Sequence, residues 1–306
     1  PALWYAGQTQ NTILLTVLLC VEWFFGGLQI ALIQIVIALS VGENERGRTF
    51  GILATGGPLS QIIGGLAAAF IVTRWGFEGL FLYCALLYLL SMLISRIIID
   101  LQVPEFESKS SNADASIPIA LLMIMGASVL AYIASFIISI ARPLAMDALN
   151  FEAGAVAGVV TVSGFVTLAL PFLAGWASDK FGRRSVFIGI YAVTALGAAG
   201  YIVAGELWQF WVAQAFVSVL SASMAVGSAL VTDAAAKQDT DRNISYFATT
   251  PWIGAVIGSA GTGIAIQQFG TSMVFAIALG LLAIAIVLGS GITIRNRVFP
   301  LRRASA

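Results

Sequence analysis

The sequence predicts an all-α, polytopic membrane protein, and three observations support this prediction. Hydrophobic residues make up 59% of the 306 positions and charged residues only 10%, whereas roughly a quarter of the residues in soluble proteins are charged. The apolar residues fall in continuous runs and do not alternate with polar ones, which favours helices over strands. Short polar stretches separate the runs. The solvent for most of the chain is therefore a lipid bilayer.

About nine transmembrane helices are expected. Runs long enough to cross roughly 30 Å of hydrocarbon fall near residues 12–40, 50–73, 77–98, 119–141, 153–175, 185–204, 207–232, 247–268 and 272–294. The polar, acidic segment 100–118 is rich in serine and asparagine, which indicates a solvated linker. The predicted organisation is thus a helical bundle over 1–99, a linker over 100–118 and a six-helix bundle with a tail over 119–306.

The basic residues predict the orientation of these helices. Alternating spans place one set of polar segments on the same side of the membrane: 41–49, 96–118, 176–184, 233–246 and 295–306. Thirteen of the 15 lysines and arginines lie in these segments, and the other two, Arg74 and Arg142, lie on the opposite side. Because cytoplasmic loops are enriched in Lys and Arg, we expect a cytoplasmic C-terminus in an inner or plasma membrane.

An internal repeat relates the two ends of the chain. Residues of the same type recur 194 positions apart, namely Arg48 and Arg242, Gly64 and Gly258, Gly76 and Gly270, and Phe81 and Phe275. Each pair occupies the same point of a loop–helix–loop unit. Such similarity between halves is typical of folds built from two repeated helical bundles.

Composition and motifs argue against several classes of function. The chain has no histidine, which removes the commonest metal ligand and general base. Cys20 and Cys84 lie inside apolar runs, where they are expected as small core residues. The net charge of zero argues against a nucleic-acid partner. No nucleophile or phosphate-binding motif is present, so we expect no enzyme activity, cofactor or metal.

A short charged stretch, Gly175-Trp-Ala-Ser-Asp-Lys-Phe-Gly-Arg-Arg184, interrupts the apolar pattern between two expected helices. Its spacing, G-x-x-x-D-K-x-G-R-R, resembles the signature loop of the major facilitator superfamily of secondary transporters. The resemblance covers essentially the whole chain and implies a twelve-helix plan of two bundles. On that plan the first two helices and most of the third are expected to precede Pro1, which makes the chain an N-terminally truncated view of the family.

The resemblance also implies a role for this signature loop. In the family the loop latches the outward-facing state, because its charges engage the ends of neighbouring helices. Asp233, at the inner end of its helix, is the expected partner of the loop's arginines. A topology anchor without gating function is the alternative. The expected gating residues are Gly175, Asp179, Lys180, Gly182, Arg183, Arg184 and Asp233.

Glu22 is the candidate for proton coupling. It lies well inside an apolar run, where a charged acid costs roughly 2.5–3.5 kcal/mol on insertion scales. This cost makes a neutral, proton-carrying form accessible. Leu18-x-x-x-Glu22-x-x-x-Gly26 also resembles the family's fourth-helix pattern, in which drug antiporters carry an arginine before the glycine. The alternative is a glutamate near the outer interface that reaches water or has a structural partner.

Departures from the antiporter patterns favour uptake over drug export. Glu22 replaces the arginine of the fourth helix, and Pro58 precedes the Gly64-Gly65 pair by six residues. That spacing does not reproduce the G-P-x-x-G-G run typical of the family's antiporters. A multidrug/proton antiporter therefore remains the less favoured alternative.

Polar and aromatic residues inside the apolar runs are candidates for a substrate cavity near the midplane. Arg142 could attract an anionic solute, or it could simply anchor its helix at the interface. The cavity candidates are Gln29, Gln34, Tyr132, Arg142, Gln214 and Trp252.

These observations together predict a monomeric secondary transporter that moves a small organic solute by alternating access. Coupling to protons or another ion is expected, with symport favoured. A non-transporting relative that acts as a sensor or scaffold, or is merely a fragment, is the competing class. A channel is disfavoured by the repeat and by the lack of a charged or carbonyl-rich filter.

Overall fold

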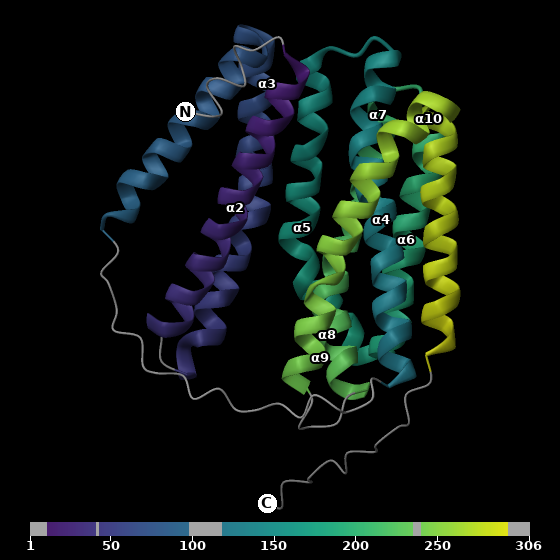
Figure 1. Cartoon of the computed structure of the whole chain (residues 1–306). Coiled ribbons are helices and arrows are strands. Elements are labelled where there is room, and N and C mark those ends of the chain that lie inside the picture. Colours follow the sequence, from purple (N-terminus) through teal and green to yellow (C-terminus); the bar gives the residue numbers. More distant parts are fainter. Residues whose placement is uncertain (1–10, 41–42, 98–117, 235–239, 293–306) are drawn as a thin grey trace, which may run out of the picture. The chain divides into compact units, whose positions relative to one another are not determined.

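The computed structural model describes residues 11–40, 43–97, 118–234 and 240–292, and these segments are helical with short turns and no strand (Figure 1). The expected all-α class is therefore confirmed. The helices are α2 (Thr12–Ser40), α3 (Glu43–Ser95), α4 (Ile119–Ala148), α5 (Ala153–Phe181), α6 (Arg183–Val203), α7 (Leu207–Ser218), the 3₁₀ turn η1 (Val219–Ala222), α8 (Ser223–Ala234), α9 (Thr240–Ala248) and α10 (Thr250–Gly291).

Within the described residues, six helical stretches are long and apolar enough to cross a membrane, so the chain is a multi-pass membrane protein. They are Thr55–Ser95, Ile119–Ala148, Ala153–Leu170, Arg183–Val203, Leu207–Ala234 and Arg242–Gly291. The first and last contain 41 and 50 residues, which as straight helices would extend about twice the roughly 30 Å of the hydrocarbon core. Each of these two stretches is folded back on itself. The expected number of nine crossings stays a prediction.

The chain reverses direction at Gly76 in α3 and at Gly270 in α10. Gly76 has φ 66° and ψ −169°, and Gly270 has φ 75° and ψ 169°. This region of backbone space is accessible almost only to glycine. In Figure 1, α10 accordingly runs as two helices, one green and one yellow, joined by a tight turn. The two glycines are one of the pairs that the sequence repeat relates, and their shared conformation supports that repeat.

Local sequence signals set the starts of several helices. The Asn11 side chain accepts hydrogen bonds from the backbone N–H groups of Ile13, at 3.0 Å, and Leu14, at 3.2 Å, which caps α2. Glu206 and Gln209 form a reciprocal capping box at the start of α7. Each device satisfies backbone donors that have no partner within the first helical turn.

The described chain forms two compact units. The first contains residues 1–109 and 146–168, and the second contains residues 110–145 and 169–306. The first unit therefore includes α2, α3 and much of α5, and the second unit includes most of α4 and everything from the end of α5 onward. The domain boundaries expected from the sequence, at 99 and 119, stay a prediction. Residues 98–117, which include nearly all of the expected linker, lie outside the described residues.

Within the first unit, small residues bring α3 and α5 into close contact. A Cβ placed on Gly164 would lie 2.7 Å from the backbone nitrogen of Ile62 and 2.7 Å from the carbonyl oxygen of Pro58. No side chain larger than hydrogen fits there unless the helices separate. Such close backbone approach is how helices associate in a lipid environment, where burial of apolar surface gives little driving force.

Within the second unit, α6 is the central helix, and α7, α8 and α10 pack against it. Its fully buried aromatic residues are Phe187 and Tyr191, whose ring centroids lie 4.7 Å apart. Other large apolar side chains of this unit face outward, for example Leu196 on α6 at 61% and Val287 on α10 at 70% exposed. Outward-facing apolar side chains of this size are expected when lipid, and not water, surrounds the helices.

Replacement of Gly270 by alanine should destabilise the protein. An added Cβ would meet no atom within 4 Å, so the cost comes from the backbone conformation alone and should be about 1–3 kcal/mol. The measurement is thermal unfolding in detergent followed by circular dichroism. Gly263→Ala is the matched control, because Gly263 is helical and also has no neighbour within 4 Å. Equal melting temperatures for the two variants would contradict the assignment of a strained turn at Gly270.

Candidate functional site

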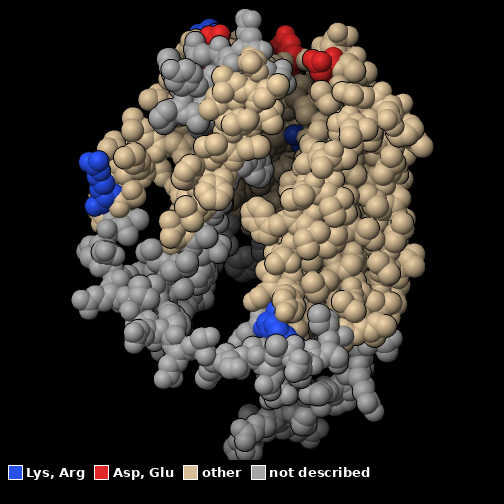
Figure 2. Space-filling model, viewed as in Figure 1, with Lys and Arg blue, Asp and Glu red and all other residues tan. Residues whose placement is uncertain are grey.

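Polar groups inside the helices have few charged partners. Most of the residues visible in Figure 2 carry no charge, and the lysines, arginines and acids in this view are sparse. Among the described residues, the groups of polar side chains that include an ionisable residue with a hydrogen-bond partner on another helix bear most directly on function. We name them the Glu22 cluster (Glu22, Gln29, Tyr88 and Ser91), the Arg142 cluster (Arg142, Tyr201, Gln214 and Ser218) and the Arg183 pair (Arg183 and Asp233).

The Glu22 cluster lies in the first unit, between α2 and the second half of α3. The Tyr88 hydroxyl donates a hydrogen bond of 2.6 Å to a carboxylate oxygen of the half-buried Glu22. Gly26, one turn after Glu22, makes room for this contact, because a Cβ there would lie 3.3 Å from the Tyr88 hydroxyl. Among the described residues, no lysine or arginine forms an ion pair with Glu22. The acid is thus held by a neutral partner.

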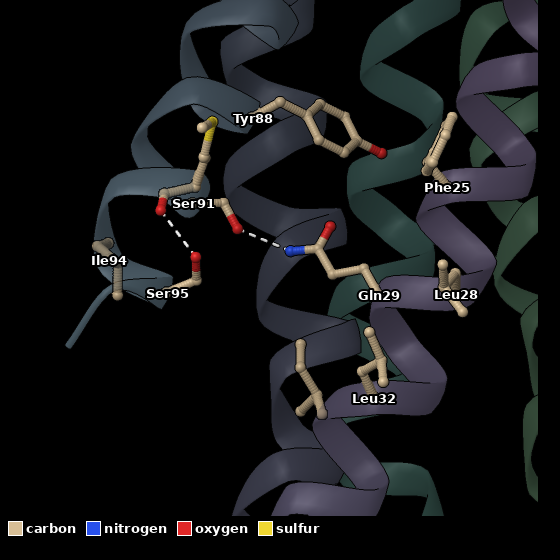
Figure 3. A pocket seen from close by; sticks show the side chains of 10 residues that line it. Phe25, Leu28, Gln29, Leu32, Tyr88, Ser91, Ile94 and Ser95 are labelled. Atoms are coloured by element: carbon tan, nitrogen blue, oxygen red, sulfur yellow. Dashed lines mark hydrogen bonds between the residues drawn. The ribbon is translucent and has the colours of Figure 1, made fainter. Parts of the chain in front are cut away.

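A pocket of about 640 Å³ lies beside this cluster. Figure 3 shows the amide nitrogen of Gln29 directed at the Ser91 hydroxyl, with a hydrogen bond of 2.7 Å between them. The walls of the pocket are otherwise mainly apolar, and the pocket volume is typical of small-molecule sites. The lining residues are Phe25, Leu28, Gln29, Leu32, Ile33, Tyr88, Ser91, Met92, Ile94 and Ser95. Gln34 lies further along α2, but its side chain is outside the described residues.

The Arg142 cluster lies in the second unit, where α4, α6 and α7 meet. Nη1 of Arg142 donates a hydrogen bond of 2.6 Å to Oε1 of Gln214, and the Tyr201 hydroxyl donates a second one, also of 2.6 Å, to the same oxygen. The amide nitrogen of Gln214 points to the Ser218 hydroxyl at 3.4 Å. Two of the cavity candidates chosen from the sequence, Arg142 and Gln214, are therefore in direct contact.

Arg142 has no acidic partner in this cluster. No carboxylate of a described residue forms an ion pair with it, and its Nε is buried without a hydrogen-bond partner. Gln214 and Tyr201 are themselves buried, at 8% and 3% exposed. A cation inside a membrane protein is costly unless an anion, a carbonyl or water compensates it. The cluster is therefore a positively charged site with neutral ligands.

The two remaining cavity candidates, Tyr132 and Trp252, are not part of this cluster. The Tyr132 hydroxyl lies 3.1 Å from the Ser223 hydroxyl and so connects α4 to α8. One turn earlier, Ser128 lies 2.9 Å from the hydroxyl of Tyr191 on α6. Trp252, near the start of α10, is 60% exposed. The structure thus gives Tyr132 a bridging contact and leaves Trp252 on the surface of its unit.

The signature loop is shorter than expected from the sequence. Residues 176–181 continue α5, and α6 begins at Arg183, so the loop predicted over 176–184 is reduced to Gly182. Gly182 has φ 86°, a conformation that favours glycine and allows the tight reversal. Gly175 lies within α5, and a Cβ there would meet no atom within 4 Å, so neither the reversal nor a close contact requires glycine at that position. Lys180, in the last turn of α5, complements the negative end of the helix dipole.

The charged residues of the loop contact neighbouring helix ends of the second unit. Nη1 of Arg183 lies 2.7 Å from Oδ1 of Asp233 and 3.0 Å from the carbonyl oxygen of Ala229, both on α8. Asp233 is the partner expected from the sequence. Arg184 donates a hydrogen bond to the carbonyl oxygen of Ser290 at the end of α10.

Of the two remaining loop residues, Lys180 and Asp179, only Lys180 has a described side chain. The ammonium group of Lys180 lies 5.0 Å from the centre of the Trp176 ring, a cation–π distance. Asp179 lies in the last turn of α5, but its side chain is outside the described residues.

Sequence reasoning missed the two tyrosines that complete these clusters. Tyr88 and Tyr201 lie in apolar runs and attracted no attention as candidates. Their signal was available, because a tyrosine hydroxyl inside a membrane helix needs a hydrogen-bond partner. The identity of each partner depends on which helices are neighbours, and one sequence does not contain that information.

The fold and these sites define a helical, multi-pass membrane protein with polar sites between its helices. The family model of the Major Facilitator Superfamily matches residues 2–125 and 124–304. The chain therefore belongs to this superfamily, and the resemblance noted from the signature loop is confirmed. A comparison with curated proteins gives no match.

Membership of the superfamily settles the general class of function. The chain is a secondary transporter, and it acts on a small-molecule substrate within a lipid bilayer. Proteins of this superfamily are in general not enzymes.

Replacement of Gln214 by leucine should destabilise the second unit. It would leave the guanidinium of Arg142 and the hydroxyl of Tyr201 without their shared acceptor, at a cost of about 1–2 kcal/mol. Thermal unfolding in detergent measures this loss. Gln267→Leu, at an exposed position of α10, is the control and should leave the melting temperature unchanged. If the two variants have the same melting temperature, the cluster contributes nothing to stability.

Proposed function

We propose that the protein couples the movement of a small organic solute to a proton gradient by alternating access, with symport as the favoured mode of coupling. The observation that supports this proposal is the position of Glu22 in the apolar helix Ile13–Gly26, with its carboxylate oxygen 2.6 Å from the hydroxyl of Tyr88. Ionisable residues inside membrane helices commonly belong to ion and proton pathways.

The neutral partner of Glu22 suits proton exchange. If an arginine or lysine held the carboxylate, protonation would leave a buried cation unpaired, which is strongly unfavourable. With tyrosine as the partner, Glu22 can bind or release a proton and still keep a hydrogen bond. The adjoining pocket offers a polar contact at Gln29 within apolar walls, and the Gln29 amide would be a substrate contact there.

The Arg183 pair, together with Asp179, Lys180, Arg184 and the turn at Gly182, would form the cytoplasmic latch. Side chains that are 37% and 42% exposed, as these two are, form ion pairs worth only about 0–1 kcal/mol. A contact of that strength can break in each transport cycle. It would bias the population of states without trapping the transporter in one of them.

The remaining features of the proposal follow from the sequence pattern. We place the signature loop and the C-terminus on the cytoplasmic side of an inner or plasma membrane, because thirteen of the 15 basic residues fall on that side. The transporter would act as a monomer of two bundles, 1–99 and 119–306, joined by the linker 100–118.

Substitution of Glu22 by glutamine should abolish proton coupling. Glutamine keeps the shape and can still accept the Tyr88 hydrogen bond, but it cannot carry a proton at neutral pH. The assay uses proteoliposomes containing the pH-sensitive dye pyranine and a panel of small organic solutes. The expected result is loss of proton-driven accumulation, while exchange of solute across the membrane without a gradient continues.

The matched control for this experiment is Glu78→Gln, which alters an exposed glutamate of the same unit. It should retain proton-driven accumulation. If Glu22→Gln accumulated solute as the unaltered protein does, Glu22 would have no role in coupling. If no solute in the panel caused proton movement through the unaltered protein, the coupling itself would be in question.

Neutralisation of the latch should shift the balance between inward-open and outward-open states. In a background of Cys20→Ser and Cys84→Ser, a reporter cysteine at Ser135 on α4 is labelled with an impermeant maleimide from either side. Both Asp179→Asn and Asp233→Asn should raise the rate of labelling from the cytoplasmic side. Asp147→Asn, an exposed acid on α4, should not. Identical labelling in all variants would leave the loop with a topological role only.

A further inference from the structure

We infer that the transported solute is an anion, and that the Arg142 cluster binds its carboxylate. This inference rests on the proposed transport function and names the class of substrate. It follows from the geometry of two donors and one acceptor between α4, α6 and α7, and from the charge that the cluster leaves uncompensated.

The geometry is that of an occupied oxyanion site. The Arg142 guanidinium and the Tyr201 hydroxyl converge on one oxygen, Oε1 of Gln214, each at 2.6 Å. Two donors that converge on one oxygen, one of them a guanidinium, form an arrangement that suits a carboxylate oxygen. The amide oxygen therefore lies where a carboxylate oxygen of a solute would bind, and Gln214 acts as an internal substitute for that oxygen.

The charge of the site favours exchange of this substitute for a true anion. Arg142 has no ion-pair partner among the described residues, and its buried Nε has no hydrogen-bond partner. A carboxylate would neutralise the guanidinium and could engage a second of its nitrogens. Hydrogen bonds between ionised partners are roughly twice as strong as neutral ones, so the anion would compete successfully for the donors.

The surroundings hold the Tyr201 donor in place. The Tyr201 ring stacks on Phe275, with ring centroids 5.2 Å apart and planes 18° apart, and it also contacts Phe210. These contacts fix the direction of the Tyr201 hydroxyl. The amide of Gln214 is tethered to the Ser218 hydroxyl by a long contact of 3.4 Å. Displacement of the Gln214 amide by a carboxylate would leave both donors, Arg142 and Tyr201, directed at the new oxygen.

The experiment measures thermal unfolding of the full chain in detergent with acetate as the smallest carboxylate probe. Acetamide, the neutral isostere, serves as the comparison at matched ionic strength. At roughly 100 mM probe, acetate should raise the melting temperature by about 2–4 °C if it is well above its dissociation constant, and acetamide should not. Benzoate and benzamide repeat the test with a larger apolar group.

Variants of the cluster separate anion binding from a purely structural role. Gln214→Glu places a carboxylate on Arg142 permanently, so it should raise the melting temperature without probe and remove the response to acetate. Tyr201→Phe keeps the aromatic packing and removes one donor, so it should weaken the response. Arg74→Gln, which alters an exposed arginine of the other unit, should respond as the unaltered protein does.

The outcomes divide clearly. Equal effects of acetate and acetamide on the unaltered protein, or an acetate response that survives both Gln214→Glu and Tyr201→Phe, would overturn the inference. Transport of only neutral solutes in proteoliposomes would overturn it as well, while leaving the transport function intact. The two proposals can also be separated. If the unaltered protein responds to acetate and the Glu22→Gln variant still accumulates solute, the anion site is supported and only the proton-coupling role is refuted.

Discussion

The absence of water in the bilayer is the constraint on which the rest of this structure depends. Every backbone N–H and C=O group in the hydrocarbon must find its partner within the protein, so the spanning segments are helices, and the chain reverses only where a residue tolerates an unusual conformation. Gly76 and Gly270 supply two such reversals with nearly the same dihedral angles. Their equivalence in the sequence repeat indicates that the same solution is used in both halves of the chain.

The same constraint decides where polar side chains can be placed. A hydroxyl, amide or charged group between helices needs a hydrogen-bond partner within the protein, either a backbone carbonyl or another side chain, because lipid offers no hydrogen bonds. The pairs Tyr88 with Glu22 and Arg142 with Gln214 therefore show which helix faces meet. In each pair an ionisable group has a neutral partner, and no described residue forms an ion pair with Glu22 or Arg142. This absence of an ion pair is what the proposed proton-coupling and anion-binding roles rest on.

Exposure separates the Arg142 cluster, in which Gln214 and Tyr201 are buried, from the Arg183 pair. Arg183 and Asp233 face water in part, and the pair also engages the end of α8 through the Ala229 carbonyl. Screening makes this ion pair weak, and the weakness fits a contact that forms and breaks as the transporter changes state. A buried pair of the same residues would hold one state much more firmly. The position of charges relative to the water interface is thus as important as their identity.

The sequence by itself determined the membrane class, the helical fold, the positions of most helices and the superfamily. These depend on long apolar runs and on the spacing G-x-x-x-D-K-x-G-R-R, both of which are local. It also selected Arg142, Gln214, Glu22 and Asp233 as candidates, because polar groups in apolar runs are conspicuous. Only the tertiary structure decided their partners. Tyr88 follows Glu22 by 66 positions and Gln214 follows Arg142 by 72, and contacts between residues so distant along the chain depend on helix packing, which local pattern does not specify.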